Sequence, residues 1–183
     1  MARVLVLLPD GCEEIEAVTI VDILRRGGVE VVMASLTGRF VHGSHNIGLE
    51  ADATLDEIAR QSFDMLVLPG GQPGATHLGA DARVLRLLRE YAAEGRYLAA
   101  ICAAPGVLVA AGLLQGKRAT SFPGAIADVS TIEYLESAVV RDGQIVTSRG
   151  PGTAMDFSLT LLALLMGEDV KARVEARLQR PKP

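Results

Sequence analysis

The sequence of 183 residues has no tryptophan and few aromatic residues, 4% in total. Its two cysteines are too few for a disulfide framework and match no zinc-site spacing. Lysine and arginine number 18 against 22 acidic residues and are scattered, so nothing marks a surface for nucleic acid or anionic lipid. No apolar run approaches the ~18 residues that cross a bilayer, and no leader pattern is present. These absences predict a cytoplasmic protein without direct nucleic-acid or membrane binding.

Apolar residues make up 49% of the sequence, enough for one core, and we expect one domain over residues 1–183. Short apolar runs that read as buried strands alternate with longer segments of helical pattern. The predicted strands cover residues 3–8, 29–34, 65–68 and 97–101, and the helices 13–26, 82–94 and 105–111. Such alternation predicts an α/β fold with a mostly parallel sheet.

The remaining segments are shorter or lie later in the chain. Three glycines between residues 35 and 54 favour a small peripheral hairpin. Further strands are predicted at 117–121, 138–140 and 144–147, helices at 55–60, 153–166 and 168–178, and a frayed tail at 179–183. Residues 141–143 are expected to join two of these strands as a hairpin. Thr153 and Asp156 have the spacing of a capping box.

Cys102 lies in the bend between a predicted strand and a helix that begins at Pro105. The residues two positions away on either side, Ala100 and Ala104, are small and allow the strand and the helix to pack closely. This pattern is typical of a nucleophile elbow, a sharp strand-to-helix turn that exposes the side chain of the nucleophile. A helix start behind the sulfur favours the thiolate. The alternative is an inert buried thiol. The position favours function, because ligands bind where the strands of parallel sheets end.

Two other segments are predicted at the same end of the sheet. Residues 69–71 form a Pro-Gly-Gly turn, and the Gly71 amide, with that of Ala103, would suit an oxyanion. A helix begins with Glu13, Glu14 and Glu16, and one of these acids, if protonated, would favour a Cys102 thiolate. Their spacing leaves open which acid it is.

The remaining reactive side chains give weaker signals. His42, His45 and His77 fall in predicted loops, and Ala103 rather than histidine follows the cysteine, which argues against a Cys-His protease. The histidine spacing predicts no metal site. Arg149 precedes a helix start, where it could either hold an anion or tie down the loop. Cys12 is a candidate to trap an oxidised Cys102 as a disulfide.

Four motifs in order resemble the ThiJ/PfpI family, and within it the YajL-like branch that includes the parkinsonism-associated deglycase. They are EEIEAV at 13–18, LPGG at 68–71, AAICAAP at 99–105 and TSRGPGT at 147–153. The resemblance implies a flavodoxin-like three-layer sandwich and a homodimer. It also implies a site that needs no cofactor, with Cys102 as nucleophile and Glu16 as the acid hydrogen-bonded to it.

The resemblance implies conversion of methylglyoxal or glyoxal to hydroxy acids, or repair of their early adducts, as glyoxalase or deglycase. An oxidative-stress sensor and chaperone without turnover is the alternative. Gly70, Arg26, His45 and Arg149 are the expected substrate-binding residues, with Arg26 reaching the partner's pocket. The sequence departs from some relatives at Phe122, where they have histidine, and at His45, where they have arginine.

Overall fold

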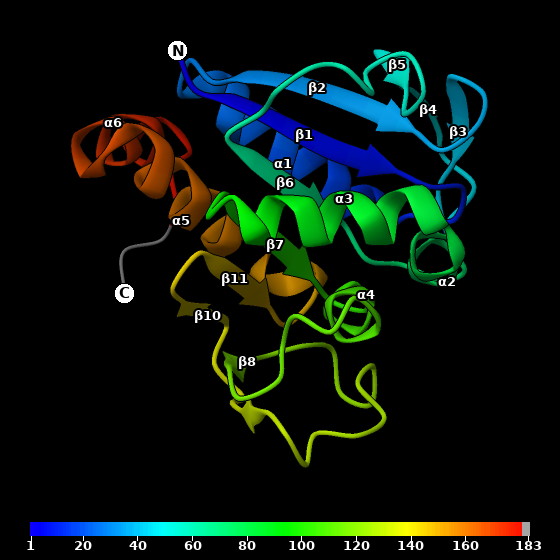
Figure 1. The fold of residues 1–183 in the computed structure, drawn as a ribbon. Helices are drawn as coiled ribbons and strands as arrows, with labels where there is room; N and C mark the ends of the chain where they lie inside the picture. Colours follow the sequence, from blue (N-terminus) through cyan, green and yellow to red (C-terminus); the bar gives the residue numbers. More distant parts are fainter. Residues whose placement is uncertain (181–183) are drawn as a thin grey trace.

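The central sheet is built around β1 (Arg3–Leu8), which pairs in parallel with β2 (Glu30–Ser35) on one side and β6 (Met65–Leu68) on the other. The computed structural model describes residues 1–180, and its main sheet has the order β10-β11-β7-β6-β1-β2-β5 (Figure 1). The other strands are β5 (Ala53–Thr54), β7 (Tyr97–Ile101), β10 (Val139–Asp142) and β11 (Ile145–Ser148). Within the main sheet of residues 1–180, only β10 runs antiparallel to its neighbour.

Alternation along β1 places apolar side chains on both faces of the sheet. Val4, Val6 and Leu8 belong to one hydrophobic core, and Leu5 and Leu7 to the other. All five are at most 1% exposed. Because burying a valine or leucine side chain contributes about 1.5–3 kcal/mol, this strand must be covered by helices on both sides.

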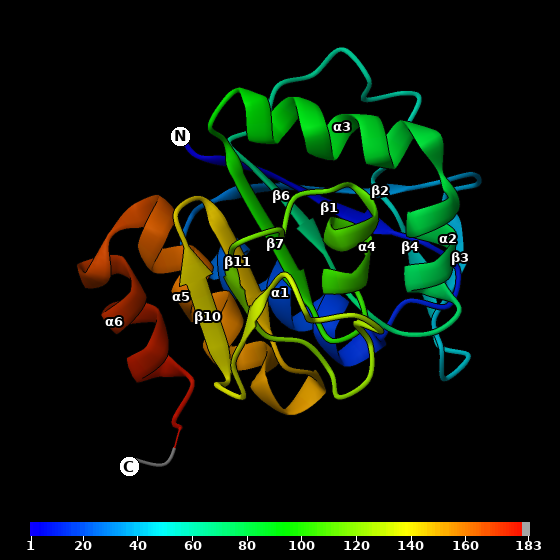
Figure 2. The same ribbon diagram turned by 60° about the horizontal axis from the view of Figure 1, so that its bottom comes forward.

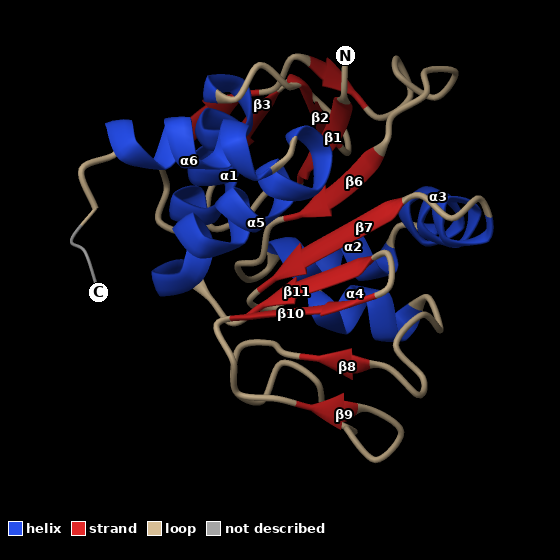
Figure 3. Cartoon of the chain, turned by 90° about the vertical axis from the view of Figure 1, so that its left-hand side faces the viewer, coloured by secondary structure: helices blue, strands red, loops and turns tan. Residues whose placement is uncertain are grey.

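Helices provide that cover in two layers (Figure 3). On one face lie α1 (Glu14–Arg26), α5 (Ala154–Met166) and α6 (Glu168–Arg177). On the other lie α2 (Gly74–Ala80), α3 (Ala82–Ala93) and α4 (Pro105–Ala110). Figure 2 shows α1 and α5 side by side beneath the sheet, and these two helices pack directly on each other. The predicted three-layer, mostly parallel architecture is therefore confirmed.

Two small strand pairs lie beside the main sheet. Strands β3 (Phe40–His42) and β4 (Gly48–Glu50) form the predicted peripheral hairpin, which is antiparallel. Strands β8 (Arg118–Ala119) and β9 (Glu133–Tyr134) pair in parallel. The strand expected over residues 117–121 is thus much shorter than predicted. Among residues 1–180, no helix combines the length and apolar character needed to cross a membrane.

The helix predicted over residues 55–60 is wrong, because this segment is a series of turns. Its amides bond three residues back, from Glu57 to Thr54, Ala59 to Asp56 and Gln61 to Ile58. A helix this short gains too few hydrogen bonds to offset nucleation. The buried Leu55 and Ile58 side chains instead anchor the turns to the core.

The capping box predicted at Thr153 is also wrong. The Thr153 hydroxyl bonds to Gly150 and Ser148, and the Asp156 carboxylate pairs with Arg180 at 2.5 Å. Helix α2 was not predicted, because glycine, proline and alanine give its segment no periodic apolar pattern. The last three residues of the predicted tail, 181–183, lie outside the described residues.

Candidate active site

Four neighbouring parallel strands, β11, β7, β6 and β1, end together at one end of the sheet. The register places Ala100 beside Leu68 and Ile101 beside Ser148. The segments after these strands therefore converge, as predicted from strand order in α/β sheets. They are residues 10–16, 69–71, Cys102 and 149–153.

Cys102 occupies the strand-to-helix turn in a strained backbone conformation. Its φ is 63°, in the left-handed region, which costs a non-glycine residue about 1–3 kcal/mol. Two backbone hydrogen bonds hold it: the Cys102 amide donates to Ser148 O, and its carbonyl accepts from Phe122 N, both at 2.9 Å. The residue is 8% exposed. The turn thus has the geometry of the predicted nucleophile elbow.

The Pro-Gly-Gly turn packs between Cys102 and the start of α1. A Cβ atom on Gly70 would lie 2.7 Å from Cys102 Cβ, so a larger residue would displace the cysteine. Gly71 has φ 89°, and a Cβ atom there would lie 2.4 Å from Glu13 N. Both glycines are therefore required by close approach, and Gly71 also by its conformation.

Glu16 projects from the first turn of α1 and is fully buried. Its Oε2 accepts a hydrogen bond from Gly70 N at 2.7 Å. The other oxygen, Oε1, is buried without a hydrogen-bond partner of good geometry among the described residues. Burial raises the pKa of Glu16 to about 7, although the Gly70 amide and the Cys102 thiol lower it. Near neutral pH this carboxyl is therefore poised to carry a proton.

The Cys102 thiol is less acidic than the sequence predicts. Burial, then the charge and hydrogen bonding of Glu16, raise the pKa of Cys102 to about 12, while the Gly71 and Ala103 amides lower it. Helix α4 spans only six residues and does not reverse this shift. Of the three effects that raise the pKa of Cys102, the charge and the hydrogen bonding of Glu16 both require that Glu16 be ionised. Protonation of Glu16 removes them and leaves the two amides to stabilise a thiolate.

The structure thus gathers Cys102, Glu16, Gly70, Gly71 and Ala103, all predicted site residues, around one sulfur. Among the described residues, no histidine ring is hydrogen-bonded to Cys102. Instead, His77 Nδ1 meets Asp10 O at 2.9 Å, and the His42 ring packs edge-on against Phe40.

The other expected substrate-binding residues contact different groups within this chain. Arg26 pairs with Asp22 at 2.6 Å and lies beside α6. Arg149 Nη2 is 3.7 Å from Glu136, and its buried Nη1 has no hydrogen-bond partner among the described residues. His45 pairs with residues of α1 and its N-terminus, described below. Their predicted substrate contacts stay predictions.

Cys12 is fully buried, and neither it nor Cys102 forms a disulfide within the described chain. Burial, followed by the nearby charge of Glu14, raises the pKa of Cys12 to about 12. A resolving thiol must be accessible and partly ionised to attack an oxidised sulfur. The surroundings of Cys12 therefore argue against the predicted disulfide exchange.

Sequence reasoning missed a cluster of polar side chains next to this site. Ser44 Oγ lies 3.1 Å from Glu13 Oε2 and 3.3 Å from Glu14 Oε2, and His45 Nδ1 lies 3.1 Å from Glu14 Oε2. The carboxylates precede the serine and histidine by 30 or more residues, so no local spacing signals the contact. Only the β3–β4 hairpin, folded over the start of α1, brings them together.

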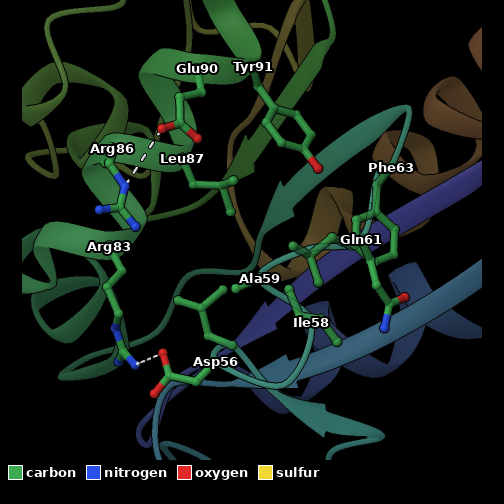
Figure 4. Close-up of a pocket in the computed structure, with 12 residues that line it drawn as sticks. Asp56, Ile58, Ala59, Gln61, Phe63, Arg83, Arg86, Leu87, Glu90 and Tyr91 are labelled. Carbon is green, nitrogen blue, oxygen red and sulfur yellow. Dashed lines mark hydrogen bonds and ion pairs between the residues drawn. The ribbon is translucent and has the colours of Figure 1, made fainter.

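A separate cavity under α3 contains none of the predicted site residues (Figure 4). Apolar side chains line part of it, together with two ion pairs, Arg83 with Asp56 and Arg86 with Glu90. The labelled lining residues are Asp56, Ile58, Ala59, Gln61, Phe63, Arg83, Arg86, Leu87, Glu90 and Tyr91. The candidate chemistry therefore lies at the strand ends and not in this cavity.

Fold and site together define an α/β sandwich protein with a cysteine on the turn after a central parallel strand. The chain belongs to the DJ-1/PfpI family, whose model matches residues 2–164. This confirms the family predicted from the four sequence motifs.

Named relatives and solved structures agree with this assignment. Protein DJ-1 homolog B of Arabidopsis thaliana is 40% identical over 99% of this chain, and the chain spans 42% of that relative's length. A deglycase of Pyrococcus abyssi is 34% identical over 89% of this chain and 99% of its own. The structure of Drosophila melanogaster DJ-1beta matches with a TM-score of 0.95 and 38% identity, covering 99% of both chains. Oxidized Toxoplasma gondii DJ-1 matches with a TM-score of 0.94 and 35% identity over both entire chains.

Proposed function

We propose that this protein converts methylglyoxal, glyoxal or their early adducts to hydroxy acids through Cys102, as a glyoxalase or deglycase without a cofactor. The observation that carries the proposal is the strained, buried cysteine beside Glu16, a carboxyl whose pKa is raised to about 7. A relative named deglycase supports the same chemistry.

The proposed reaction begins when the Cys102 proton passes to Glu16 and the thiolate attacks the aldehyde carbon. A C–S bond forms, the C=O bond becomes an alkoxide, and the Gly71 and Ala103 amides donate to that oxygen. The alkoxide takes a proton to give a hemithioacetal. Glu16 then takes the proton from the carbon bonded to sulfur, and the neighbouring carbonyl oxygen gains a proton, which gives an enediol. Transfer of the proton of the first hydroxyl to the neighbouring carbon then leaves a thioester of the hydroxy acid. Water hydrolyses the thioester and restores the thiol.

Conversion of methylglyoxal to lactate without glutathione tests this proposal. We expect many turnovers in the wild type, none in Cys102→Ser, and a loss of at least about 100-fold in Glu16→Gln, in line with removal of a general acid–base. Lactate formed per enzyme separates catalysis from scavenging of aldehyde by the thiol. Full turnover by Cys102→Ser would refute the mechanism.

The second candidate function is a cysteine-based oxidation sensor and chaperone. It is favoured by the same two amides and protonated carboxyl, which would also stabilise an oxidised sulfur, and by a similar structure solved in an oxidized state. Substoichiometric lactate in all three proteins, together with stable Cys102 oxidation by one equivalent of peroxide, would favour this function over turnover.

We further propose that the chain acts as a cytoplasmic homodimer of single-domain protomers that binds neither nucleic acid nor membrane. Exposed Ile15 and Val18 on α1, at 58% and 51%, support a dimer contact there. In such a dimer Arg26 would approach the partner's pocket, while Gly70, His45 and Arg149 would contact substrate.

A further inference from the structure

Four polar atoms converge where the β3–β4 hairpin meets the start of α1. His45 Nδ1 lies 3.1 Å from Glu14 Oε2 and 3.6 Å from Glu13 Oε2. Ser44 Oγ lies 3.1 Å from both His45 Nδ1 and Glu13 Oε2. The candidate ligand atoms of Glu13, Glu14 and His45 all lie within 4.8 Å of one another.

These separations fit the coordination sphere of a small divalent cation. Two ligand atoms that are each about 2.0–2.2 Å from Zn²⁺ at a tetrahedral angle lie about 3.3–3.6 Å apart. The two pairs that involve His45, at 3.1 and 3.6 Å, need to move by only a few tenths of an ångström. The two carboxylate oxygens lie within 4.8 Å of each other and would close by at most about 1.5 Å. Carboxylate oxygen and imidazole nitrogen are both zinc ligands, and open zinc sites have three protein ligands with the fourth position left to water or substrate.

The negative charge of the cluster also favours a divalent cation. Glu13 and Glu14 are 8% and 5% exposed, so two neighbouring carboxylates are withdrawn from water. Within the described chain their cationic contact is the single imidazole of His45, which is itself 70% exposed at the side chain. A divalent ion would balance both carboxylates, whereas a protonated histidine balances one.

One of the ligands is already oriented by backbone groups. Glu14 Oε1 accepts hydrogen bonds from His45 N at 2.8 Å and Ile47 N at 3.2 Å, which leaves Oε2 directed at the imidazole. Such outer-shell bonds fix the geometry of metal-ligating carboxylates. The exposed His45 gives an ion access from solvent.

We propose that Glu13, Glu14 and His45 form a Zn²⁺-type divalent cation site with its fourth position open to water or to Ser44. Histidine spacing alone does not predict this site, because its carboxylates lie more than 30 residues before His45. The site is distinct from Cys102, although the Glu13 amide donates to Gly70 O at 2.9 Å and so connects the two.

Zn²⁺ titration of the full, chelator-treated chain by calorimetry tests the site, with Co²⁺ absorption as a second readout of ligand geometry. A Cys102→Ser background removes binding by the reactive thiol. We expect one Zn²⁺ per chain in that background and an affinity loss of at least about 100-fold in His45→Ala, since even outer-shell losses cost 10- to 100-fold. Glu13→Gln should also weaken binding by at least about 10-fold.

His42→Ala is the matched control, because His42 is an exposed histidine of the same hairpin that lies outside the cluster. It should bind Zn²⁺ like its parent. Glu14→Gln is avoided, since Glu14 also holds the loop amides. Absence of Zn²⁺ binding, unchanged binding in a folded His45→Ala variant, or binding that disappears with Cys102 would each overturn the proposal.

Discussion

Glu16 links the stability of the fold to pH, because its carboxyl is fully buried. Burial raises its pKa from 4.5 to about 7, so the folded chain holds this proton more tightly than the unfolded chain does. The resulting stabilisation is complete below about pH 4.5 and is lost as the pH rises to about 7. The shift corresponds to about 3 kcal/mol.

Replacing Glu16 by glutamine should remove this dependence. Glu16 of the folded protein titrates roughly between pH 5 and 8. As the pH rises through this range, the free energy of unfolding of the wild type should fall by about 3 kcal/mol relative to that of Glu16→Gln. Urea titrations at several pH values measure the difference. Parallel curves for the two proteins would contradict a buried, protonated Glu16.

Other titrating groups do not obscure that comparison. Burial opposes ionisation of Glu14, but the amides and imidazole around it lower its pKa to about 2, so its contribution is lost only as the pH falls below about 4.5. Hydrogen bonding to Glu14 raises the pKa of His45, whose contribution is lost as the pH rises above 6.5. Both groups remain in Glu16→Gln, so their effects cancel in the difference.

At the scale of the elements, the side chain of Asp81 caps the N-terminus of α3 and helps to hold this helix on the sheet. The Asp81 carboxylate accepts from Arg83 N at 2.8 Å and pairs with the Arg83 guanidinium, which also bonds Leu36 O and Asp56 (Figure 4 shows the last contact). Asp81 thus caps α3 and, through Arg83, ties the helix to the turns beneath it.

Asp81→Ala should destabilise the fold by about 0.5–2 kcal/mol, the range for loss of an N-cap side chain. Urea unfolding at pH 7 measures the loss. Glu90→Ala on the same helix is the control, because the Arg86–Glu90 pair at 3.6 Å is exposed and should contribute less than about 0.5 kcal/mol. Equal losses of unfolding free energy in the two variants would show that the Asp81 cap contributes no more than an exposed ion pair.

The elements that sequence could predict are those whose own pattern determines them. The run RVLVLL and the turn at Cys102 are governed by burial and local chain geometry, so the sequence predicts both. Helix α2 and the turns at 55–60 depend on tertiary contacts, such as the approach of Gly74 to Gly11 O. The same limit applies to the site. Glu16 was chosen by resemblance, while the contact of His45 with Glu14 depends on the folded hairpin.

At the scale of the whole molecule, the exposed apolar face of α1 determines the proposed assembly. Val18 is 51% exposed and lies beside a hollow lined by Val21, Met33 and Leu49. Val18→Asp should weaken dimerisation by at least about 10-fold, because a charge would be buried in the contact. Sedimentation or light scattering over a range of concentrations measures the effect.

Val109→Asp provides the control on the opposite layer of the sandwich. Val109 is 37% exposed on α4, so a charge there should leave the dimer intact. A monomeric wild type, or equal weakening by both substitutions, would contradict a dimer contact on α1.

The main sheet offers little backbone to which another strand could add. On one side it finishes with β5, which has only two residues. On the other, β10 is flanked by β8, and Asp142 bonds the Arg118 amide at 3.0 Å (Figure 3 shows the two strands adjacent). Because one edge strand is short and the other is covered, aggregation by pairing of sheet edges is disfavoured. Association through a helical face would instead be self-limiting, stopping at a closed pair.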